Sequence, residues 1–254
     1  MKVVVVGDSG LIQEKLVEAI TTAGHEVVQV LLGAERNTPD VGQLIHLLAG
    51  ASVVVDVSVA PSLDGAESLR FHQTLTINLL AAELTTGVGH HVVLSVVGDR
   101  NSQDNGYFHA KAVQEELVRL SPVPYSIVHA TQFFEFVRSI AELATIDNAA
   151  RLAPAVVQPE AAQDVAESLG AIALGAPVND TVELVGPDHF GLVEFVDLVL
   201  STHREPQQPL SDEQALLLAT EADHRVVPEE GSHPDVTSAR LREWLRTQRD
   251  TKSG

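Results

Sequence analysis

The sequence predicts an α/β fold built on a doubly wound parallel sheet. Short β-branched runs alternate with helical patterns over the first ninety residues, as in strands joined by crossover helices. These runs are almost continuously apolar, which indicates strands buried on both faces. A chain of 254 residues with 44% hydrophobic and 20% charged residues is long enough for one large domain or a core with a smaller appendage.

The elements of the first half follow one another regularly. The first strand is expected at 2–6, and the helix after it has apolar positions at helical spacing from Leu11 to Ala23 before Gly24 ends it. Further strands are expected at 26–32, 52–57, 91–97 and 125–129, and helices at 44–48, 69–84 and 107–120.

Beyond residue 150 the pattern loosens. Helices are expected at 161–174, 192–200 and 212–220, and a strand at 181–185. We therefore expect a nucleotide-binding core at 1–155 and a smaller capping portion at 156–254 that packs on the same core. The stretch 239–254 holds five basic and two acidic residues and predicts a solvated final helix with a frayed tail.

Composition excludes several classes of protein. A net charge of −19, spread over both halves, argues against binding to nucleic acid. The absence of Cys excludes disulfides and thiolate chemistry. No apolar stretch approaches the roughly 20 residues of a membrane helix, and the N-terminus lacks the pattern of a secretory signal. The expected location is cytoplasmic and the expected partner is a small-molecule substrate.

The first candidate site is the turn from Gly7 to Gln13, between the first strand and the first helix. Glycines let the backbone approach a pyrophosphate at a helix N-terminus. Two residues argue against this interpretation: Gln13 replaces a third small residue, and Asp8 places a carboxylate beside the phosphate position. A tight turn without a ligand is the alternative.

The second candidate site is the pair Tyr107 and Lys111, together with Ser95 at the end of a strand. Residues four apart share one helix face, so the lysine is expected close to the phenol and should lower its pKa. A tyrosine of this kind is a general acid or base, and Ser95 would hydrogen-bond the substrate oxygen.

Together with the strand 92–98 and the stretch 129–136, these residues resemble an atypical short-chain dehydrogenase/reductase of the NmrA-like, NAD(P)-binding family, over roughly residues 1–200. The resemblance implies a Rossmann-type core. It implies proton donation by Tyr107, tuning of that tyrosine and ribose binding by Lys111, and orientation of the substrate carbonyl by Ser95. The cofactor-binding residues expected from the resemblance and the sequence are Gly7, Ser9, Gly10, Leu11, Arg36 and Ser58.

The sequence departs from the family at the cofactor. Leu31 and Leu32 occupy the place, about 20 residues past the turn, where an acidic residue would hold a ribose hydroxyl. Arg36 stands four residues further on and could contact a 2′-phosphate. These changes favour NADP over NAD if a nucleotide binds, and they leave open that none does.

The leading functional hypothesis is an NADPH-dependent reductase of a small carbonyl, quinone or polyketide-like substrate. The alternatives are a cofactor-free relative that catalyses redox-neutral proton transfer, and a non-catalytic nucleotide or metabolite sensor. Four phenylalanines, at 108, 133, 134 and 136, either line an apolar substrate pocket or pack in the core. The neighbours His90 and His91 point to opposite faces of a strand, so no metal site is expected.

Overall fold

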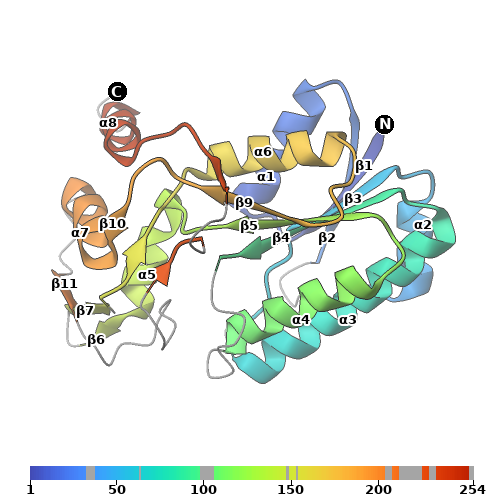
Figure 1. The fold of residues 1–254 in the computed structure, drawn as a ribbon, viewed down its shortest axis with the longest axis horizontal. Helices are drawn as coiled ribbons and strands as arrows, with labels where there is room; N and C mark the ends of the chain where they lie inside the picture. The colour runs from blue at the N-terminus through green and yellow to red at the C-terminus, as the bar shows by residue number, and fades with distance from the viewer. Residues whose placement is uncertain are drawn as a thin grey trace. The chain divides into compact units, whose positions relative to one another are not determined.

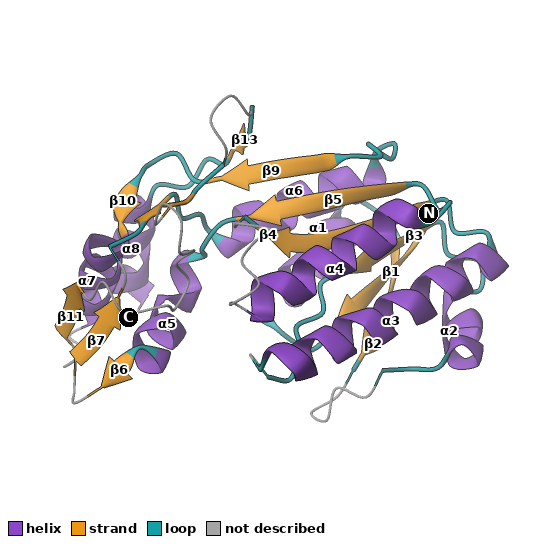
Figure 2. Ribbon diagram, turned by 60° about the horizontal axis from the view of Figure 1, so that its bottom comes forward, coloured by secondary structure: helices purple, strands orange, loops and turns teal. Residues whose placement is uncertain are grey.

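The computed structural model describes residues 1–32, 38–62, 64–97, 106–146, 149–152, 154–203, 208–211, 225–228 and 233–251. Its main sheet has seven strands in the order β13-β9-β5-β4-β3-β1-β2, most of which are labelled in Figure 1, with β13 labelled in Figure 2. Strands β1, β2, β3 and β4 pair in parallel. The predicted doubly wound α/β fold is therefore confirmed.

Every element predicted in the first half is present, with ends shifted by a few residues. The strands are β1 (Lys2–Gly7), β2 (Glu26–Leu31), β3 (Val53–Asp56), β4 (His90–Val96) and β5 (Tyr125–Ala130). The helices are α1 (Leu11–Thr22), α2 (Val41–Leu48), α3 (Gly65–Thr86) and α4 (Gly106–Leu120). Helix α3 ends at Gly87, whose φ of 76° is left-handed and suits glycine.

Helices cover both faces of the sheet. Helices α3 and α4 lie side by side on one face, and α1 and α6 (Ala162–Leu174) lie on the other (Figures 1 and 2). The first residues of α3 and α4 nearly touch, because a Cβ on Gly106 would stand 2.2 Å from the Cα of Gly65. This close approach requires glycine at both positions.

The chain divides into two compact units, and neither is continuous in sequence. Unit 1 is Met1–Val96, Arg100–His129 and Val165–Val182, and unit 2 is Val97–Asp99, Ala130–Asp164 and Glu183–Gly254. Strand β9 (Thr181–Val185) begins in unit 1 and ends in unit 2. The expected boundary between residues 155 and 156 stays a prediction.

Unit 2 contains two helices that match the expected ones, at 192–203 and 241–251, together with short elements that the sequence did not reveal. Its helical elements are η1 (Phe134–Phe136), α5 (Val137–Leu143), α7 (Leu192–His203) and α8 (Leu241–Thr251). Its short strands are β6 (Thr145–Ile146), β7 (Ala149–Leu152), β8 (Val156–Val157), β10 (Phe190–Gly191), β11 (Gln208–Ser211), β12 (Arg225–Val226) and β13 (Asp235–Val236). The helix predicted at 212–220 lies outside the described residues. Among the described residues, no helix has the length and apolar character needed to span a membrane.

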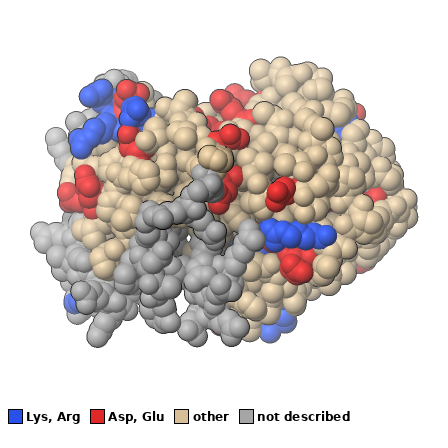
Figure 3. Space-filling model, viewed as in Figure 1, with Lys and Arg blue, Asp and Glu red and all other residues tan. Residues whose placement is uncertain are grey.

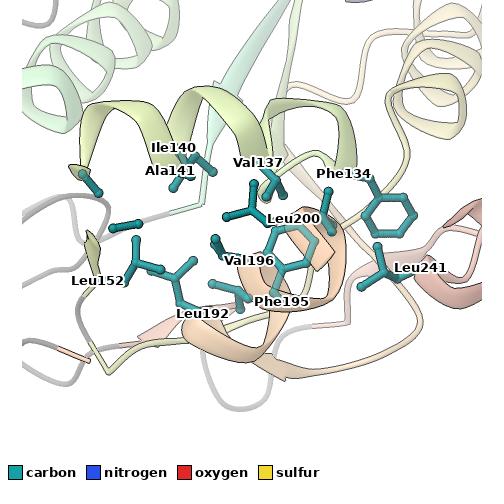
Figure 4. Packing of buried hydrophobic residues seen from close by; sticks show 14 of the residues in the cluster. Phe134, Val137, Ile140, Ala141, Leu152, Leu192, Phe195, Val196, Leu200 and Leu241 are labelled. Atoms are coloured by element: carbon teal, nitrogen blue, oxygen red, sulfur yellow. The ribbon is translucent and has the colours of Figure 1, made fainter. Parts of the chain in front are cut away.

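The core of unit 2 is an apolar cluster that includes Phe134, Phe195 and Leu152 (Figure 4). The final helix contributes to this core, since Leu241 and Leu245 are buried in it. The prediction of a fully solvated helix was therefore wrong for one face of α8. The other face is solvated and basic: Arg242 and Arg246 are exposed, and blue side chains gather over α8 in Figure 3.

Candidate functional site

The glycine-rich turn places the start of α1 at the carboxyl end of β1. Gly10 is the N-cap residue of α1, with φ −107° and ψ 168°, and it has no side chain to cap the helix. A Cβ on Gly10 would meet no atom nearer than the Asp8 carbonyl oxygen at 3.6 Å. The helix N-terminus at Gly10 is thus unobstructed by its own cap residue, as an anion site requires.

Gly7 serves a different purpose, because its missing side chain makes room for Gln13. A Cβ on Gly7 would stand 2.7 Å from the Gln13 Oε1 atom and 3.1 Å from a Val57 methyl group. The Gln13 side chain is buried, and its Nε2 atom donates to Gln29 Oε1 at 3.2 Å. Gln13 therefore packs against the turn and fills space that a small residue would leave.

The remaining residues that bear on cofactor binding lie at the turn and at the ends of β2 and β3. Leu31 lies in register with Gly7 and is 56% exposed, so an apolar side chain marks the end of β2. Ser58 is buried after β3, and its backbone N–H donates to Asp56 Oδ1 at 2.9 Å. Ser9 is exposed and Leu11 is half-buried at the turn. Arg36 lies outside the described residues.

Ser95 is buried beneath α4, and its hydroxyl is already engaged. Its Oγ atom donates to Glu115 Oε1 at 2.6 Å. His129 Nε2 lies 2.8 Å from the same oxygen, and Arg119 donates to the other oxygen, Oε2, at 3.0 Å. Glu115 thus gathers groups from β4, β5 and α4. Donation by Ser95 to a substrate oxygen would require it to leave Glu115.

Lys111 also points into this buried region. Its Nζ atom donates to the Leu94 carbonyl oxygen at 2.8 Å and to Gln114 Oε1. Gln114 Nε2 in turn donates to Asp56 Oδ2 at 2.9 Å. A chain of hydrogen bonds therefore joins α4 to the carboxyl end of β3 and to β4.

The electrostatics of the Tyr107 and Lys111 pair differ from the expectation. Burial raises the pKa of Tyr107 to about 12. The expected lowering of the tyrosine pKa is therefore wrong in direction. For Lys111, burial lowers the pKa to about 8, although Asp56 and Glu115 oppose this change. Both groups sit where the charged form loses hydration.

Two further buried groups lie on this face, and the sequence did not reveal their surroundings. His91 Nδ1 lies 2.7 Å from Glu83 Oε1, and both side chains are fully buried. Burial lowers the His91 pKa, but the Glu83 and Asp56 carboxylates raise it more, so the net change is upward. His72 is fully buried, and among the described residues neither of its ring nitrogens has a hydrogen-bond partner. Burial and the Lys111 charge lower the pKa of His72 to about 2.

Some of these residues left a signal in the sequence. Lys111, Gln114 and Glu115 are spaced three and four apart, so they share a helix face with the buried residues Phe108 and Val118. Polar residues at the apolar positions of a helix indicate a buried network. His90 and His91 face opposite sides of β4, as alternation predicts, and His90 Nε2 lies 2.9 Å from Ser126 Oγ.

The four phenylalanines separate into buried and exposed rings. Phe108, Phe133 and Phe134 are buried, and Phe134 packs in the unit 2 core against Phe195 and Trp244. Phe136 is 42% exposed. Core packing therefore explains Phe134. Within the described residues, no group of three or more His, Cys, Asp or Glu side chains is placed to hold a metal ion.

Comparison with solved structures shows which proteins share this fold. The dTDP-glucose 4,6-dehydratase DesIV of Streptomyces venezuelae, solved with NAD, is 16% identical with a TM-score of 0.71 over 100% of this chain and 98% of that chain. The UDP-glucose 4-epimerase of Thermus thermophilus, also with NAD, is 15% identical with a TM-score of 0.73 over 100% of this chain and 99% of its own.

A reductase resembles the chain to a similar degree. The dTDP-4-dehydrorhamnose reductase of Clostridium acetobutylicum is 16% identical, with a TM-score of 0.66 over 98% of this chain and 93% of that one. No family model matches the sequence, and no curated protein matches it. At these identities the likeness establishes the fold: a Rossmann-like α/β sheet shared along the whole chain with NAD-bound enzymes.

Proposed function

We propose that this protein is an oxidoreductase of the short-chain dehydrogenase/reductase type that binds a nicotinamide dinucleotide at the N-terminus of α1. The observation that carries the proposal is the uncapped helix start at Gly10, at the carboxyl end of β1. Open α/β sheets bind ligands at this edge. The NAD-bound structures that share the fold support the same assignment.

The residues of the turn fit a diphosphate in part. The open N-cap at Gly10 favours an anion, and Gln13 packs on Gly7 without reaching the cap. The half-buried Asp8 carboxylate opposes the negative charge of a diphosphate. We therefore expect weaker binding than an all-glycine turn would give. When bound, the cofactor supplies hydride transfer to a small carbonyl, quinone or polyketide-like substrate.

NADP is the cofactor we favour. The exposed Leu31 at the end of β2 offers no carboxylate to a ribose hydroxyl, so the usual contact for NAD is missing. Arg36 follows in the next segment and would pair with a 2′-phosphate. NADPH is therefore expected to bind more tightly than NADH.

In this proposal Tyr107 donates the proton to the substrate oxygen. Its raised pKa keeps the phenol protonated at neutral pH, as a proton donor must be. Lys111, four residues further along α4, is the positively charged residue that the family resemblance pairs with this tyrosine. Because the Ser95 proton is directed to Glu115, Ser95 presents its acceptor lone pairs to any ligand that reaches it.

Nucleotide binding is tested by placing a side chain at the helix start. Gly10→Val should fold normally, because the extended backbone and the open space tolerate a Cβ. Its affinity for NADPH should fall at least tenfold, since the new side chain covers the helix N-terminus. Calorimetric titration of NADPH and NADH measures both affinities.

The matched control is Gly89→Val, in the loop between α3 and β4. A Cβ on Gly89 would meet no atom nearer than the Ser52 carbonyl oxygen at 3.8 Å, so the two substitutions are sterically similar. Gly89 precedes the amino end of β4, away from the carboxyl ends of the strands where the nucleotide is proposed to bind. The control substitution should leave NADPH affinity unchanged. Equal affinity in wild type and Gly10→Val would refute binding at α1.

The catalytic role is tested by Tyr107→Phe. The variant should fold, bind NADPH with near wild-type affinity and lose about a hundredfold or more of turnover on the best substrate of a carbonyl and quinone panel. NADPH oxidation followed by absorbance gives the rate. Unchanged turnover would remove Tyr107 from the mechanism and leave nucleotide binding standing.

A second candidate is a non-catalytic nucleotide sensor, and one observation favours it. The polar groups of Ser95 and Lys111 are engaged inside unit 1, with Glu115, Leu94 and Gln114. Tight nucleotide binding with no turnover across the substrate panel would select this function over the reductase.

A further inference from the structure

Gln114 occupies a central place in the buried network of α4. It is fully buried, and its amide connects two charged groups of opposite sign. Its oxygen accepts from the Lys111 ammonium, and its Nε2 atom donates to Asp56 Oδ2 at 2.9 Å. Gln114 is three residues from Lys111, so both side chains lie on the same face of the helix.

The chemistry of its two neighbours fixes the orientation of this amide. An ammonium can only donate hydrogen bonds and a carboxylate can only accept them. The Gln114 oxygen must therefore face Lys111, and its NH₂ group must face Asp56. A flipped amide would leave both charged groups opposed to like partners in a region without solvent. Asp56 is itself held by the backbone N–H of Ser58 at 2.9 Å.

Two hydrogen-bond acceptors stabilise the charged form of the buried Lys111 side chain. The Leu94 carbonyl oxygen and Gln114 Oε1 accept from its ammonium. Within the described part of the chain, the charged and titratable groups around it come from three elements: Asp56 of β3, Glu115 of α4 and His72 of α3. The two carboxylates favour the ammonium, while burial disfavours it.

We propose that Gln114 is the positioning residue of Lys111: its amide holds the ammonium against the end of β4 and couples it to the carboxylate of Asp56. Gln114 itself touches no reacting atom in this assignment. Helical spacing places Gln114 on the buried face of α4, but spacing alone does not mark it as a functional residue. The importance of Lys111 for catalysis rests on the proposed function, but its positioning by Gln114 does not.

Lysine NMR of the full chain, without nucleotide or substrate, tests this assignment. The protein has only four lysines, so ¹³Cε-labelled lysine gives a simple spectrum in which Lys111→Met identifies the Lys111 signal. In wild type this signal should titrate near pH 8. In Gln114→Met, which keeps the shape and removes both hydrogen bonds, the midpoint should fall by about one pH unit because the ammonium loses an acceptor.

The direction of the change separates positioning from packing. A variant that merely loosened the interior would admit water and raise the Lys111 midpoint toward the roughly 10.4 of an exposed lysine. A rise, or no change, in Gln114→Met overturns the proposal. If that variant fails to fold, Gln114→Leu decides, because its apolar side chain also offers no acceptor to the Lys111 ammonium and should also lower the midpoint.

Gln158→Met is the matched control. Gln158 is also a buried glutamine, but it lies in unit 2, where its Nε2 atom donates to the Gly186 carbonyl oxygen at 2.8 Å. This variant should leave the Lys111 midpoint unchanged. If the wild type binds no nucleotide but Gln114→Met lowers the Lys111 midpoint, the proposed function is refuted and the role of Gln114 stands. If the wild type binds nucleotide but Gln114→Met does not lower the midpoint, the role of Gln114 is refuted and the proposed function stands.

Discussion

One layer of the unit 1 interior differs from the apolar core of unit 2. Beneath α3 and α4, unit 1 buries Asp56, Glu83, Lys111, Gln114 and Glu115, which make directional hydrogen bonds to strands and to one another. Unit 2 buries an apolar cluster from α5, α7, α8 and the short strands near them (Figure 4).

This difference shows which interactions set the position of each helix. Buried polar groups need specific partners at specific distances, so α4 is held on β3, β4 and β5 in one arrangement. An apolar cluster is stabilised mainly by filled volume, and it tolerates changes of shape that conserve volume. A candidate site with fixed geometry is thus expected in unit 1.

The largest predicted effect compares one substitution to leucine in each unit. Glu115→Leu should cost about 3 to 5 kcal/mol of unfolding free energy, because Ser95, His129 and Arg119 lose their shared carboxylate. Phe195→Leu in the unit 2 core should cost less, about 1 to 2 kcal/mol, since it removes only part of an apolar side chain and leaves a small cavity. Urea unfolding of both variants measures the costs. Equal costs would show that the two interiors do not differ in this way.

The sequence predicted the first half of the fold well for a physical reason. Each strand of unit 1 is an apolar run bounded by turn residues, and each helix has clear apolar spacing. In unit 2 the strands are as short as Val156–Val157, and their pairing partners are far along the chain, as for Phe190 with Val157. Two-residue strands carry no periodicity, so pattern reasoning could not find them.

The candidate site shows the same limit. The turn at Gly10 and the residues Ser95, Tyr107 and Lys111 were identified from local spacing. Their partners were not, because Asp56 and Gln114 are 58 positions apart in sequence and meet only through the fold. The wrong direction for the Tyr107 pKa has the same origin, since spacing alone does not reveal burial.

The next prediction concerns pH and the one buried acid of unit 2 with a strongly raised pKa among the described residues. Burial raises the pKa of Glu160 to about 7, although Thr131 donates its N–H and hydroxyl to Oε1. At Glu160 the folded protein then binds a proton more tightly than the unfolded chain does. The contribution of this proton to the free energy of unfolding is fully present below about pH 4.5 and is lost as the pH rises through 7.

Glu160→Gln keeps an oxygen for the Thr131 N–H but cannot ionise. Its unfolding free energy should be close to wild type at pH 5 and should exceed it by up to about 3 kcal/mol at pH 8.5. Urea unfolding at the two pH values measures this difference. A difference between the proteins that is the same at pH 5 and pH 8.5 would rule out titration of Glu160.

The smallest predicted effect concerns His72 in unit 1, whose contribution to stability changes with pH in the opposite direction to that of Glu160. Because the pKa of His72 is lowered to about 2, the unfolded chain binds a proton at this residue that the folded protein does not. Stability from the neutral ring is therefore present above about pH 6.5 and is lost as the pH falls toward 2. His72→Leu removes this titration and the two unpartnered ring nitrogens.

Relative to wild type, the His72→Leu variant should gain about 2 kcal/mol between pH 7 and pH 5, whatever its stability at pH 7. His72→Gln, which also does not titrate, should show the same gain even if its amide packs less well. If both variants gain the same stability relative to wild type on acidification, the gain comes from the lost protonation of His72 and not from packing. Leucine and glutamine differ in polarity, but neither carries a charge. If neither variant gains stability on acidification relative to wild type, the folded protein takes up the proton at His72, and the polar interior of unit 1 then accommodates a further positive charge beside Lys111.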